Sequence, residues 1–350
     1  MKKFEQIVIF PESTIKQSMK QINQNGVGSL IVINKKFNVL GVLTDGDIRR
    51  AIFAEKKIDE SIKGIYSKKI IKYQESKFNI EKLEKKSLEK NLNIIPILKK
   101  NKLVDFYSIK SKTQNKNSVK TVIMAGGLGT RMKPFTDVFP KPMLPINNQT
   151  MIEIVINQFK KYGLSNFIFT INYKSDLLSA YLKTLSSQID VKYKILKENK
   201  RLGTAGSLKF LKKKLKKDFF VTNCDTILKA NLNNIYQFHV KNRNDITIIA
   251  AVKNETIPYG VLKVSKNQNF SKIFEKPKNS YIINTGVYVF NPTILNLIPK
   301  KNEVFDMNQL ISISKIKKKK IKVYLIDGDS WHDVGQTGNY HKYINDNKIV

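Results

Sequence analysis

The chain has 350 residues, of which 41% are hydrophobic and 26% charged, so it is too apolar to be disordered and long enough for two or three domains. It carries 63 Lys and Arg against 28 Asp and Glu, and the formal net charge of +35 first suggests nucleic acid or a membrane surface as partner. The apolar runs stay under about ten residues, which excludes a membrane-spanning helix of roughly 20.

The positive charge is spread along the whole chain. Residues 1–117 carry a net charge of +13 and residues 118–350 a net charge of +22, and only five of the 63 cations are Arg. Nucleic-acid binders concentrate charge on one face and use Arg to read bases. We therefore interpret the lysine excess as a composition bias and expect no nucleic-acid or membrane partner. The single cysteine, Cys224, and the lack of a convincing signal peptide favour a cytoplasmic location.

The N-terminal part contains an internal repeat. Residues 32–44 (VINKKFNVLGVLT) and 96–108 (PILKKNKLVDFYS) align without gaps, and each predicts a short strand, a Lys-Lys turn and a second strand. Helical patterns precede both, at residues 13–23 and 80–90. The repeat predicts two copies of one small α+β unit.

The first copy continues into the segment GVLTDGDIRR, residues 41–50. This segment resembles the strand-to-helix junction of a cystathionine-β-synthase-type (CBS) motif, and the two copies resemble a CBS-domain pair over 1–117. The resemblance implies a regulatory adenine-nucleotide site, in which Thr44 meets phosphate and Asp45 the ribose. The second copy has Asp105 in place of the glycine and lacks a Thr-Asp pair, so it supports one site at most. A structural or oligomerising module, with Asp45 as a helix cap, stays open as the alternative.

A polar linker is expected at residues 112–120, and the chain then alternates between strand and helix patterns. Strands are expected at 121–125, 166–171, 191–196 and 219–223, and helices at 151–162, 176–185 and 207–215. Strand-rich runs follow from residue 247, at 247–252, 260–264, 285–290 and 322–326. This order predicts a Rossmann-like α/β domain over 118–350, with a mainly parallel sheet covered by helices on both faces.

The strongest chemical signal is the segment AGGLGTRM, residues 125–132, directly after the first strand of that domain. Glycines let backbone N–H groups approach a phosphate without obstruction by a Cβ atom. The spacing matches neither the dinucleotide fingerprint nor a Walker A loop. The segment PKPMLP at 140–145 follows, and its prolines are expected to bring Lys141 back toward the loop.

The combined motif resembles the signature of the nucleoside-diphosphate-sugar pyrophosphorylases, which are sugar-1-phosphate nucleotidyltransferases. The resemblance implies that a sugar-1-phosphate oxygen attacks the α-phosphate of a nucleoside triphosphate and that pyrophosphate leaves. The protein then positions anions instead of supplying a nucleophile, with Arg131 and Lys141 as catalytic cations. The nucleotide-binding residues implied are Ala125, Gly126, Gly127, Gly129, Thr130, Glu198 and Gly203.

Glu198 stands in the segment ENKRLGTAG, which the resemblance places at the base-reading loop. A carboxylate can accept hydrogen bonds from both N1–H and the 2-amino group of guanine. Uracil offers one N3–H between two carbonyl groups and suits a glutamine better. We therefore favour GTP as the donor, with UTP as the alternative.

Two aspartates are the candidates for a Mg²⁺ site. Asp225 follows the strand at 219–223, at the sheet edge where open α/β folds bind ligands, and Asp333 lies in the segment WHDVG. Two carboxylates and nucleotide phosphates together suit Mg²⁺. The resemblance further implies Lys276 as a catalytic cation that holds the sugar phosphate, and the sugar-binding residues Gly260, Glu275, Asn284 and Thr285.

A CBS pair joined to the LGTAG segment resembles the glucosamine-1-phosphate guanylyltransferases of legionaminic-acid routes, which gives glucosamine-1-phosphate as the expected acceptor. Mannose-1-phosphate is the main alternative sugar. A non-catalytic nucleotide sensor is the alternative from another class, and the complete set of expected cations and carboxylates argues against it. We also expect a homo-oligomer.

Overall fold

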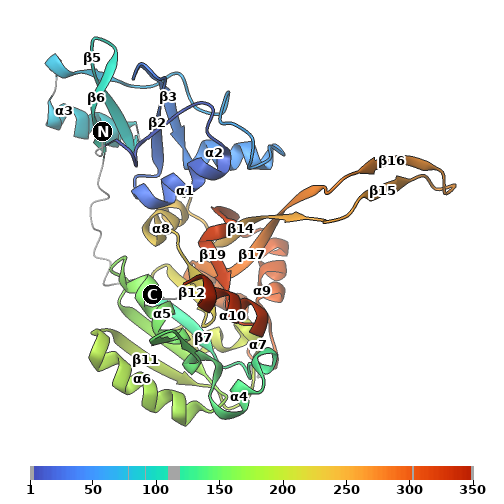
Figure 1. Cartoon of the computed structure of the whole chain (residues 1–350). Helices are drawn as coiled ribbons and strands as arrows, with labels where there is room; N and C mark the ends of the chain where they lie inside the picture. Colours follow the sequence, from blue (N-terminus) through green and yellow to red (C-terminus); the bar gives the residue numbers. More distant parts are fainter. Residues whose placement is uncertain (1–3, 78, 91, 109–118, 302, 348–350) are drawn as a thin grey trace.

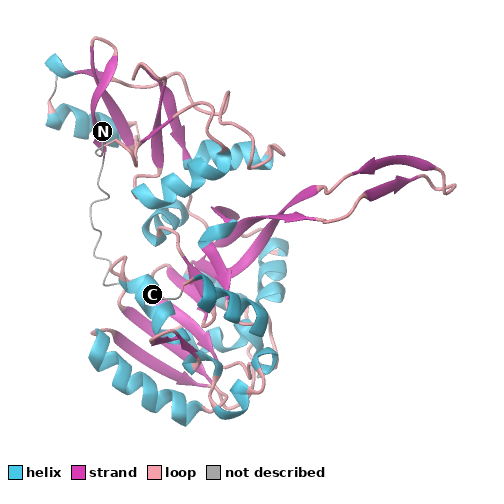
Figure 2. Ribbon diagram, in the orientation of Figure 1, coloured by secondary structure: helices cyan, strands magenta, loops and turns pink. Residues whose placement is uncertain are grey.

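The computed structural model describes residues 4–77, 79–90, 92–108, 119–301 and 303–347. Most of the expected linker, residues 112–118, lies outside these ranges. Figures 1 and 2 show a smaller N-terminal part with two little sheets, and a larger part built around one long sheet. A thin two-stranded arm projects away from the larger part, as a continuation of two neighbouring strands of its sheet.

Both predicted hairpins are present in the N-terminal part. The elements of the first unit are β1 (Val8–Ile9), α1 (Ile15–Asn25), β2 (Ser29–Ile33), β3 (Val39–Thr44) and α2 (Asp45–Phe53). Those of the second are β4 (Tyr73–Gln74), η1 (Glu75–Lys77), α3 (Ile80–Glu89), β5 (Ile94–Lys99) and β6 (Lys102–Ser108). In each unit a parallel pair, β1–β2 or β4–β5, is followed by an antiparallel hairpin. The two units therefore repeat one strand arrangement.

The large sheet has the strand order β11-β10-β7-β12-β17-β14-β18. Its strands are β7 (Lys120–Ala125), β10 (Asn166–Ile171), β11 (Lys192–Lys197), β12 (Phe219–Asn223), β14 (Ile246–Thr256), β17 (Lys278–Phe290) and β18 (Ile321–Asp327). All neighbouring pairs are parallel except the two that β17 makes with β12 and β14. The mainly parallel α/β architecture expected from the alternating pattern is confirmed.

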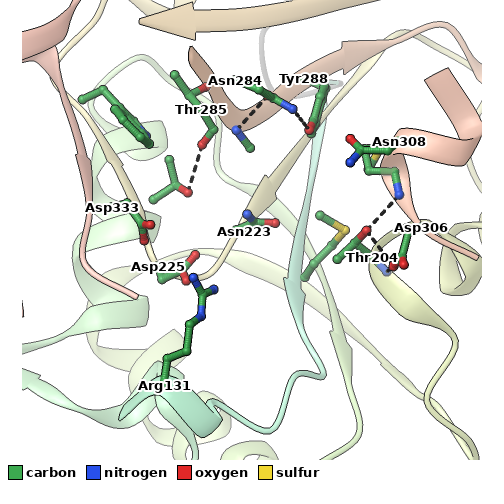
Figure 3. Close-up of a pocket in the computed structure, with 15 residues that line it drawn as sticks. Arg131, Thr204, Asn223, Asp225, Asn284, Thr285, Tyr288, Asp306, Asn308 and Asp333 are labelled. Carbon is green, nitrogen blue, oxygen red and sulfur yellow. Dashed lines mark hydrogen bonds between the residues drawn. The ribbon is translucent and has the colours of Figure 1, made fainter. Parts of the chain in front are cut away.

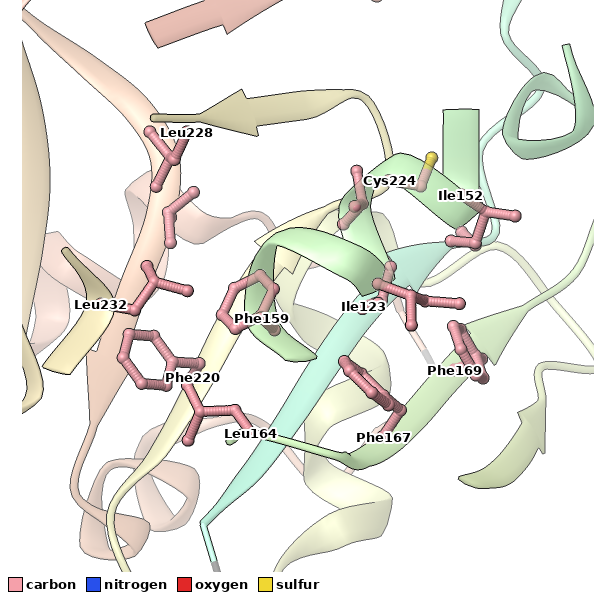
Figure 4. Packing of buried hydrophobic residues seen from close by; sticks show 14 of the residues in the cluster. Ile123, Ile152, Phe159, Leu164, Phe167, Phe169, Phe220, Cys224, Leu228 and Leu232 are labelled. Atoms are coloured by element: carbon pink, nitrogen blue, oxygen red, sulfur yellow. The ribbon is translucent and has the colours of Figure 1, made fainter. Parts of the chain in front are cut away.

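Two hydrophobic layers cover the sheet because successive strand residues point to opposite faces. Ile123 packs in one layer and its neighbour Val122 in the other. The first layer, seen in Figure 4, includes buried residues of α5 (Met151–Lys160), α6 (Ser175–Ile189) and α8 (Leu232–Lys241). The second includes residues of η5 (Ser207–Leu211), η6 (Pro292–Leu297) and α9 (Met307–Ile316).

Short elements surround the carboxyl ends of the parallel strands. They are η3 (Thr130–Met132), α4 (Phe135–Val138), η4 (Lys141–Met143), β8 (Pro145–Ile146), β9 (Gln149–Thr150), α7 (Gly203–Gly206), β13 (Thr226–Leu228), η7 (Gly328–Ser330), β19 (Trp331–Asp333) and α10 (Thr337–Asp346). The α-helix expected at 207–215 is instead the 3₁₀-helix η5. Its buried residues Leu208 and Leu211 are three apart, which matches the 3₁₀ repeat of three residues per turn.

The N-terminal part packs directly on the larger part. Ala250, Val252 and Leu325, from β14 and β18, join one hydrophobic cluster with buried residues of α1, β2 and α2. Asn23 donates to Asp327 at 3.3 Å, and Lys16 pairs with Asp329 at 3.0 Å. The small domain therefore rests on the edge of the sheet formed by β14 and β18. Within the described residues, no helix combines the length and apolarity needed to cross a bilayer.

The arm is an extension of β14 and β17 beyond the sheet. Their antiparallel ladder continues from the pair Val252–Ile282 to the pair Thr256–Lys278. A second ladder, between β15 (Val261–Val264) and β16 (Phe270–Phe274), forms its outer end. No further strand pairs with β15 or β16 among the described residues.

Candidate active site

The glycine loop runs from the end of β7 into η3. Gly129 has φ +69°, and a Cβ atom there would lie 2.8 Å from Thr136 Cγ2, so only glycine fits this turn without strain. Gly127 is exposed, with nothing within 4 Å of the place where a Cβ would stand. At Gly127 the loop backbone is therefore open to an approaching anion.

A pocket of about 430 Å³ lies beside this loop, and Figure 3 shows its polar lining. Arg131 reaches it from η3, Asp225 from the turn after β12, and Asp333 from the end of β19. These segments lie far apart in sequence, yet all meet near the carboxyl ends of β7 and β12. This is the edge at which open α/β sheets bind ligands.

Strand pairing brings the two aspartates together. β13 and β19 are antiparallel, with Thr226 opposite Asp333, which places Asp333 beside Asp225. The backbone N–H of Val334 donates to the Asp225 carbonyl at 3.0 Å, and that of Gly335 to Asp333 Oδ1 at 2.8 Å. The sequence could suggest each aspartate singly, but the pairing that unites them spans over a hundred residues.

Lys141 lies against these carboxylates. Its side chain is buried and its Nζ forms an ion pair with Asp225. A Cβ atom added to Gly129 would lie 3.0 Å from Lys141 Cβ, so the segment containing the prolines does return to the glycine loop. Gly335 lies against the same group of side chains. A Cβ atom added to Gly335 would collide with the Asp225 carboxylate and would lie 2.5 Å from Lys141 Nζ and 2.8 Å from Asp333 Oδ1.

Glu198 lies on the other side of the glycine loop. A Cβ on Gly126 would lie 3.3 Å from Glu198 Oε1, and Asn172 Nδ2 donates to the Glu198 carbonyl at 2.7 Å. Burial raises the pKa of Glu198, although hydrogen bonds from Ser207 and Thr170 act in the opposite direction. The carboxylate thus lies at the rim of the loop but does not line the pocket, and its role in base reading stays a prediction.

Gly203 has φ +76° and lies in a turn that packs closely on a neighbouring segment. A Cβ there would lie 2.7 Å from the Phe305 carbonyl oxygen, so this turn packs tightly on the segment before α9. The packing positions Thr204, whose backbone N–H donates to Asp306 Oδ1 at 3.0 Å. Thr204 and Asp306 both line the pocket.

The structure divides the expected sugar-binding residues into two groups. Asn284 and Thr285 line the pocket; Asn284 Nδ2 donates to the Tyr288 hydroxyl at 2.8 Å, and Thr285 Oγ1 to the Ile249 carbonyl at 2.8 Å. Gly260, Glu275 and Lys276 are exposed on the arm and do not line the pocket. Lys278 lies next to these residues and six positions before Asn284 in β17. At the usual rise of a strand, the distance between Lys278 and Asn284 is about 20 Å.

Sequence reasoning missed several pocket residues. Asn223, Tyr288, Asp306, Asn308 and Trp331 all line it. Asn223 and Trp331 adjoin motif residues that were recognised, so their position was a usable signal. Asp306 carried one as well, because an Asp followed three residues later by a Gln is typical of a helix start, and the structure shows that capping box.

In the N-terminal part, Thr44 and Asp45 already have partners. Thr44 caps α2 and exchanges hydrogen bonds with Asp47, and Asp45 forms an ion pair with Arg49. The Arg49 guanidinium stacks on Phe238 at 4.3 Å and on Tyr324 at 4.8 Å, both in the larger part. Burial raises the pKa of Asp45. Arg49 thus contributes to the contact between the two domains, and the nucleotide site at Thr44 and Asp45 stays a prediction.

Comparison with known proteins shows the family of the chain. Residues 120–348 match the model of the nucleotidyl transferase family, and residues 2–54 match that of the CBS domain. The chain therefore belongs to the nucleotidyl transferase family and has an N-terminal CBS domain.

Among curated proteins, a mannose-1-phosphate guanyltransferase of Aspergillus oryzae is 31% identical over 229 residues, covering 63% of this chain and 62% of that protein. Mannose-1-phosphate guanylyltransferase 1 of Arabidopsis thaliana is 30% identical over 230 residues, covering 63% of each chain. The match thus spans less than two thirds of these relatives. The crystal structure of HddC from Yersinia pseudotuberculosis has a TM-score of 0.53 at 24% identity, covering 66% of this chain and all of that one, and shows the same fold.

Proposed function

We propose that this protein transfers a nucleotidyl group from a nucleoside triphosphate to a sugar-1-phosphate, with release of pyrophosphate. The observation that carries the proposal is one pocket beside an open glycine loop, at which two cations and two carboxylates from separate segments meet. These are Arg131, Lys141, Asp225 and Asp333. Such a set suits a reaction between two anions that must be held together.

The chemistry asks for positioning and charge stabilisation. A sugar-1-phosphate oxygen attacks the α-phosphate, and the bond from that phosphorus to the β-phosphate oxygen breaks. Arg131 is exposed at the pocket and offers a planar fork to the leaving pyrophosphate. Lys141 is buried beside Asp225 and provides a fixed positive charge that costs no reorganisation during the reaction.

Asp225 and Asp333 fit a Mg²⁺ site. Their carboxylates converge at Gly335, where only a glycine leaves room, and oxygen ligands from two carboxylates and phosphates are what this ion takes. When bound there, Mg²⁺ would neutralise phosphate charge. The ion pair with Lys141 fixes the orientation of the Asp225 carboxylate at that place.

GTP is the proposed donor. Glu198, beside Gly126, can accept from two donors of guanine, and the relatives from Aspergillus oryzae and Arabidopsis thaliana are guanylyltransferases by name. Their names also favour mannose-1-phosphate, which stands as the acceptor beside glucosamine-1-phosphate. We place the sugar against Asn284, Thr285 and the backbone of Gly286, which line the pocket, and not against Glu275 and Lys276, which lie outside it on the arm.

The test is pyrophosphate release from a matrix of four nucleoside triphosphates against mannose-1-phosphate, glucosamine-1-phosphate and glucose-1-phosphate. We expect release with GTP and one hexose-1-phosphate, dependent on Mg²⁺. Release with UTP alone would overturn the assignment of Glu198. No release from any pair would overturn the proposed function.

A further inference from the structure

Two runs of lysine lie outside the site described above. Residues 212–217 (KKKLKK) and 315–320 (KIKKKK) each contain five lysines and no acidic residue. Nine of the ten lysines are exposed and Lys319 is half-buried, whereas Leu215 is buried and anchors the first run to the core. The runs are about a hundred residues apart in the sequence, so their relation to each other depends on the fold.

The fold brings both runs to one edge of the large sheet. The first run leads directly into β12 and the second into β18. Phe290 of β17 stands opposite both Phe219 and Ile246, and Ile246 in turn stands opposite Ile321. The starts of β12 and β18 are therefore in one row, three strand spacings or about 14 Å apart. The two runs form a single basic edge at the amino ends of the parallel strands.

The two aspartates next to the runs already have partners. Asp218 accepts a hydrogen bond from Asn291 Nδ2 at 2.9 Å. Asp245 accepts one from the backbone N–H of Lys320 at 2.9 Å, and its other carboxylate oxygen pairs with Lys319 at 3.5 Å. Two aspartates against ten lysines leave the basic edge strongly positive.

A cavity of about 250 Å³ lies in the basic edge, and four of its five lining residues are lysines. These are Lys120, Lys214, Lys216 and Lys217, and the fifth is Leu215. Lys120 begins β7, the neighbour of β12, and its Nζ donates to the Lys214 carbonyl at 2.7 Å. Several ammonium groups around one hollow suit a phosphate group.

Each run also has an exposed apolar side chain beside it or within it. Phe210, in η5, is 43% exposed, and Ile316, at the end of α9, is 76% exposed. Both helices cover the same face of the sheet, and Lys209 Nζ lies 5.2 Å from the centre of the Phe210 ring. Clustered lysines with exposed apolar side chains among them are typical of a surface that binds to anionic lipid. A surface that reads nucleic acid uses Arg, and neither run contains one.

We propose that the basic edge binds the surface of a membrane that contains anionic phospholipids. The lysines contact the phosphate headgroups, and Phe210 and Ile316 enter the layer between them. Asn223, at the opposite end of β12, lines the pocket, so the bound protein keeps its pocket away from the membrane. The even spread of lysine along the chain gave no sign of this partner, because the two runs meet only in the folded sheet. The proposal does not depend on the proposed function.

Cosedimentation with vesicles tests the proposal. The wild-type chain should bind vesicles of phosphatidylcholine and phosphatidylglycerol at low salt and bind far less to phosphatidylcholine alone, and its affinity should fall as salt screens the charges. Lys212→Glu/Lys213→Glu/Lys216→Glu should weaken binding by about tenfold or more. Phe210→Ser/Ile316→Ser should also weaken binding, because it removes the apolar contacts with the lipid layer.

The matched control is Lys56→Glu/Lys57→Glu/Lys82→Glu, which changes the net charge by the same amount at exposed positions of the N-terminal part. This variant should bind the vesicles as the wild type does, and circular dichroism verifies the folding of each variant. Equal losses in the two triple variants, or equal binding to both kinds of vesicle, would overturn the proposal. Tighter binding to a DNA duplex than to the vesicles, lost in the Lys212→Glu/Lys213→Glu/Lys216→Glu variant, would overturn it in favour of nucleic acid.

Discussion

Arg131 and Asp225 show at the scale of single residues how the site depends on charge. Arg131→Ala should lower turnover by about a hundredfold or more, because it removes a fixed donor from the developing charge. Asp225→Asn should also reduce turnover and weaken the dependence on Mg²⁺, and it leaves Lys141 buried without its ion pair. Steady-state pyrophosphate release checks both, with circular dichroism to verify folding. Wild-type turnover in either variant would refute its role.

Glu198 gives a prediction with a pH dependence. Its pKa is raised by burial above the ordinary value of 4.5, and only the ionised carboxylate accepts from both guanine donors. The KM for GTP should therefore rise as pH falls through that raised pKa, whereas Glu198→Gln should show a high KM with no such pH step. The exposed Glu12→Gln serves as the control and should behave as wild type. Equal pH profiles for wild type and Glu198→Gln would contradict the base-reading role.

At the scale of elements, the turn after β19 is the part of the site with the least space. Gly335→Ala should abolish turnover, because the added methyl group meets the carboxylate of Asp225 and approaches Lys141 and Asp333. Gly338→Ala, three residues later in α10, adds its methyl group to open space and should retain activity. Turnover of the two variants, measured side by side, decides; an active Gly335→Ala would contradict the convergence.

At this scale the local sequence patterns predicted the bounds of several strands and helices well. These are segments in which the residue composition typical of the element coincides with burial. The strands at 166–171 and 219–223 have the expected bounds, and the expected helix at 176–185 is the core of α6. The pairing of β13 with β19 was not predictable, because two three-residue strands separated by about a hundred residues have no periodic signal. The arm was missed for another reason: its strand pattern gives no information on what the strands pack against.

At the scale of the whole molecule, we expect the contact between the two domains to contribute to the free energy of unfolding. Arg49→Ala should lower the free energy of unfolding by about 3 kcal/mol, because the largely buried Asp45 carboxylate would lose its partner and the stacking on Phe238 and Tyr324 would be lost. Arg49→Lys should recover only part, since an ammonium lacks the planar face. Arg50→Ala, at an exposed neighbour, should cost under about 1 kcal/mol. Denaturant unfolding measures all three, and equal losses at Arg49 and Arg50 would contradict a docking role.

The contact between the two domains could not be predicted from the sequence. Arg49 belonged to a recognised motif, but Phe238 and Tyr324 are ordinary core-type residues far along the chain, and nothing local connects them. Likewise, the motif residues of the pocket were identifiable one by one, whereas the placement of Gly260, Glu275 and Lys276 on a projecting arm depends on tertiary structure.

The most direct measurement of the central claim is the identity of the product. Wild-type protein with GTP, Mg²⁺ and either mannose-1-phosphate or glucosamine-1-phosphate should yield a GDP-sugar, identified by mass spectrometry, in an amount equal to the pyrophosphate released. The matched Asp225→Asn reaction should yield little of it. Hydrolysis of GTP without a GDP-sugar, or no conversion with any nucleoside triphosphate and sugar-1-phosphate, would contradict the account.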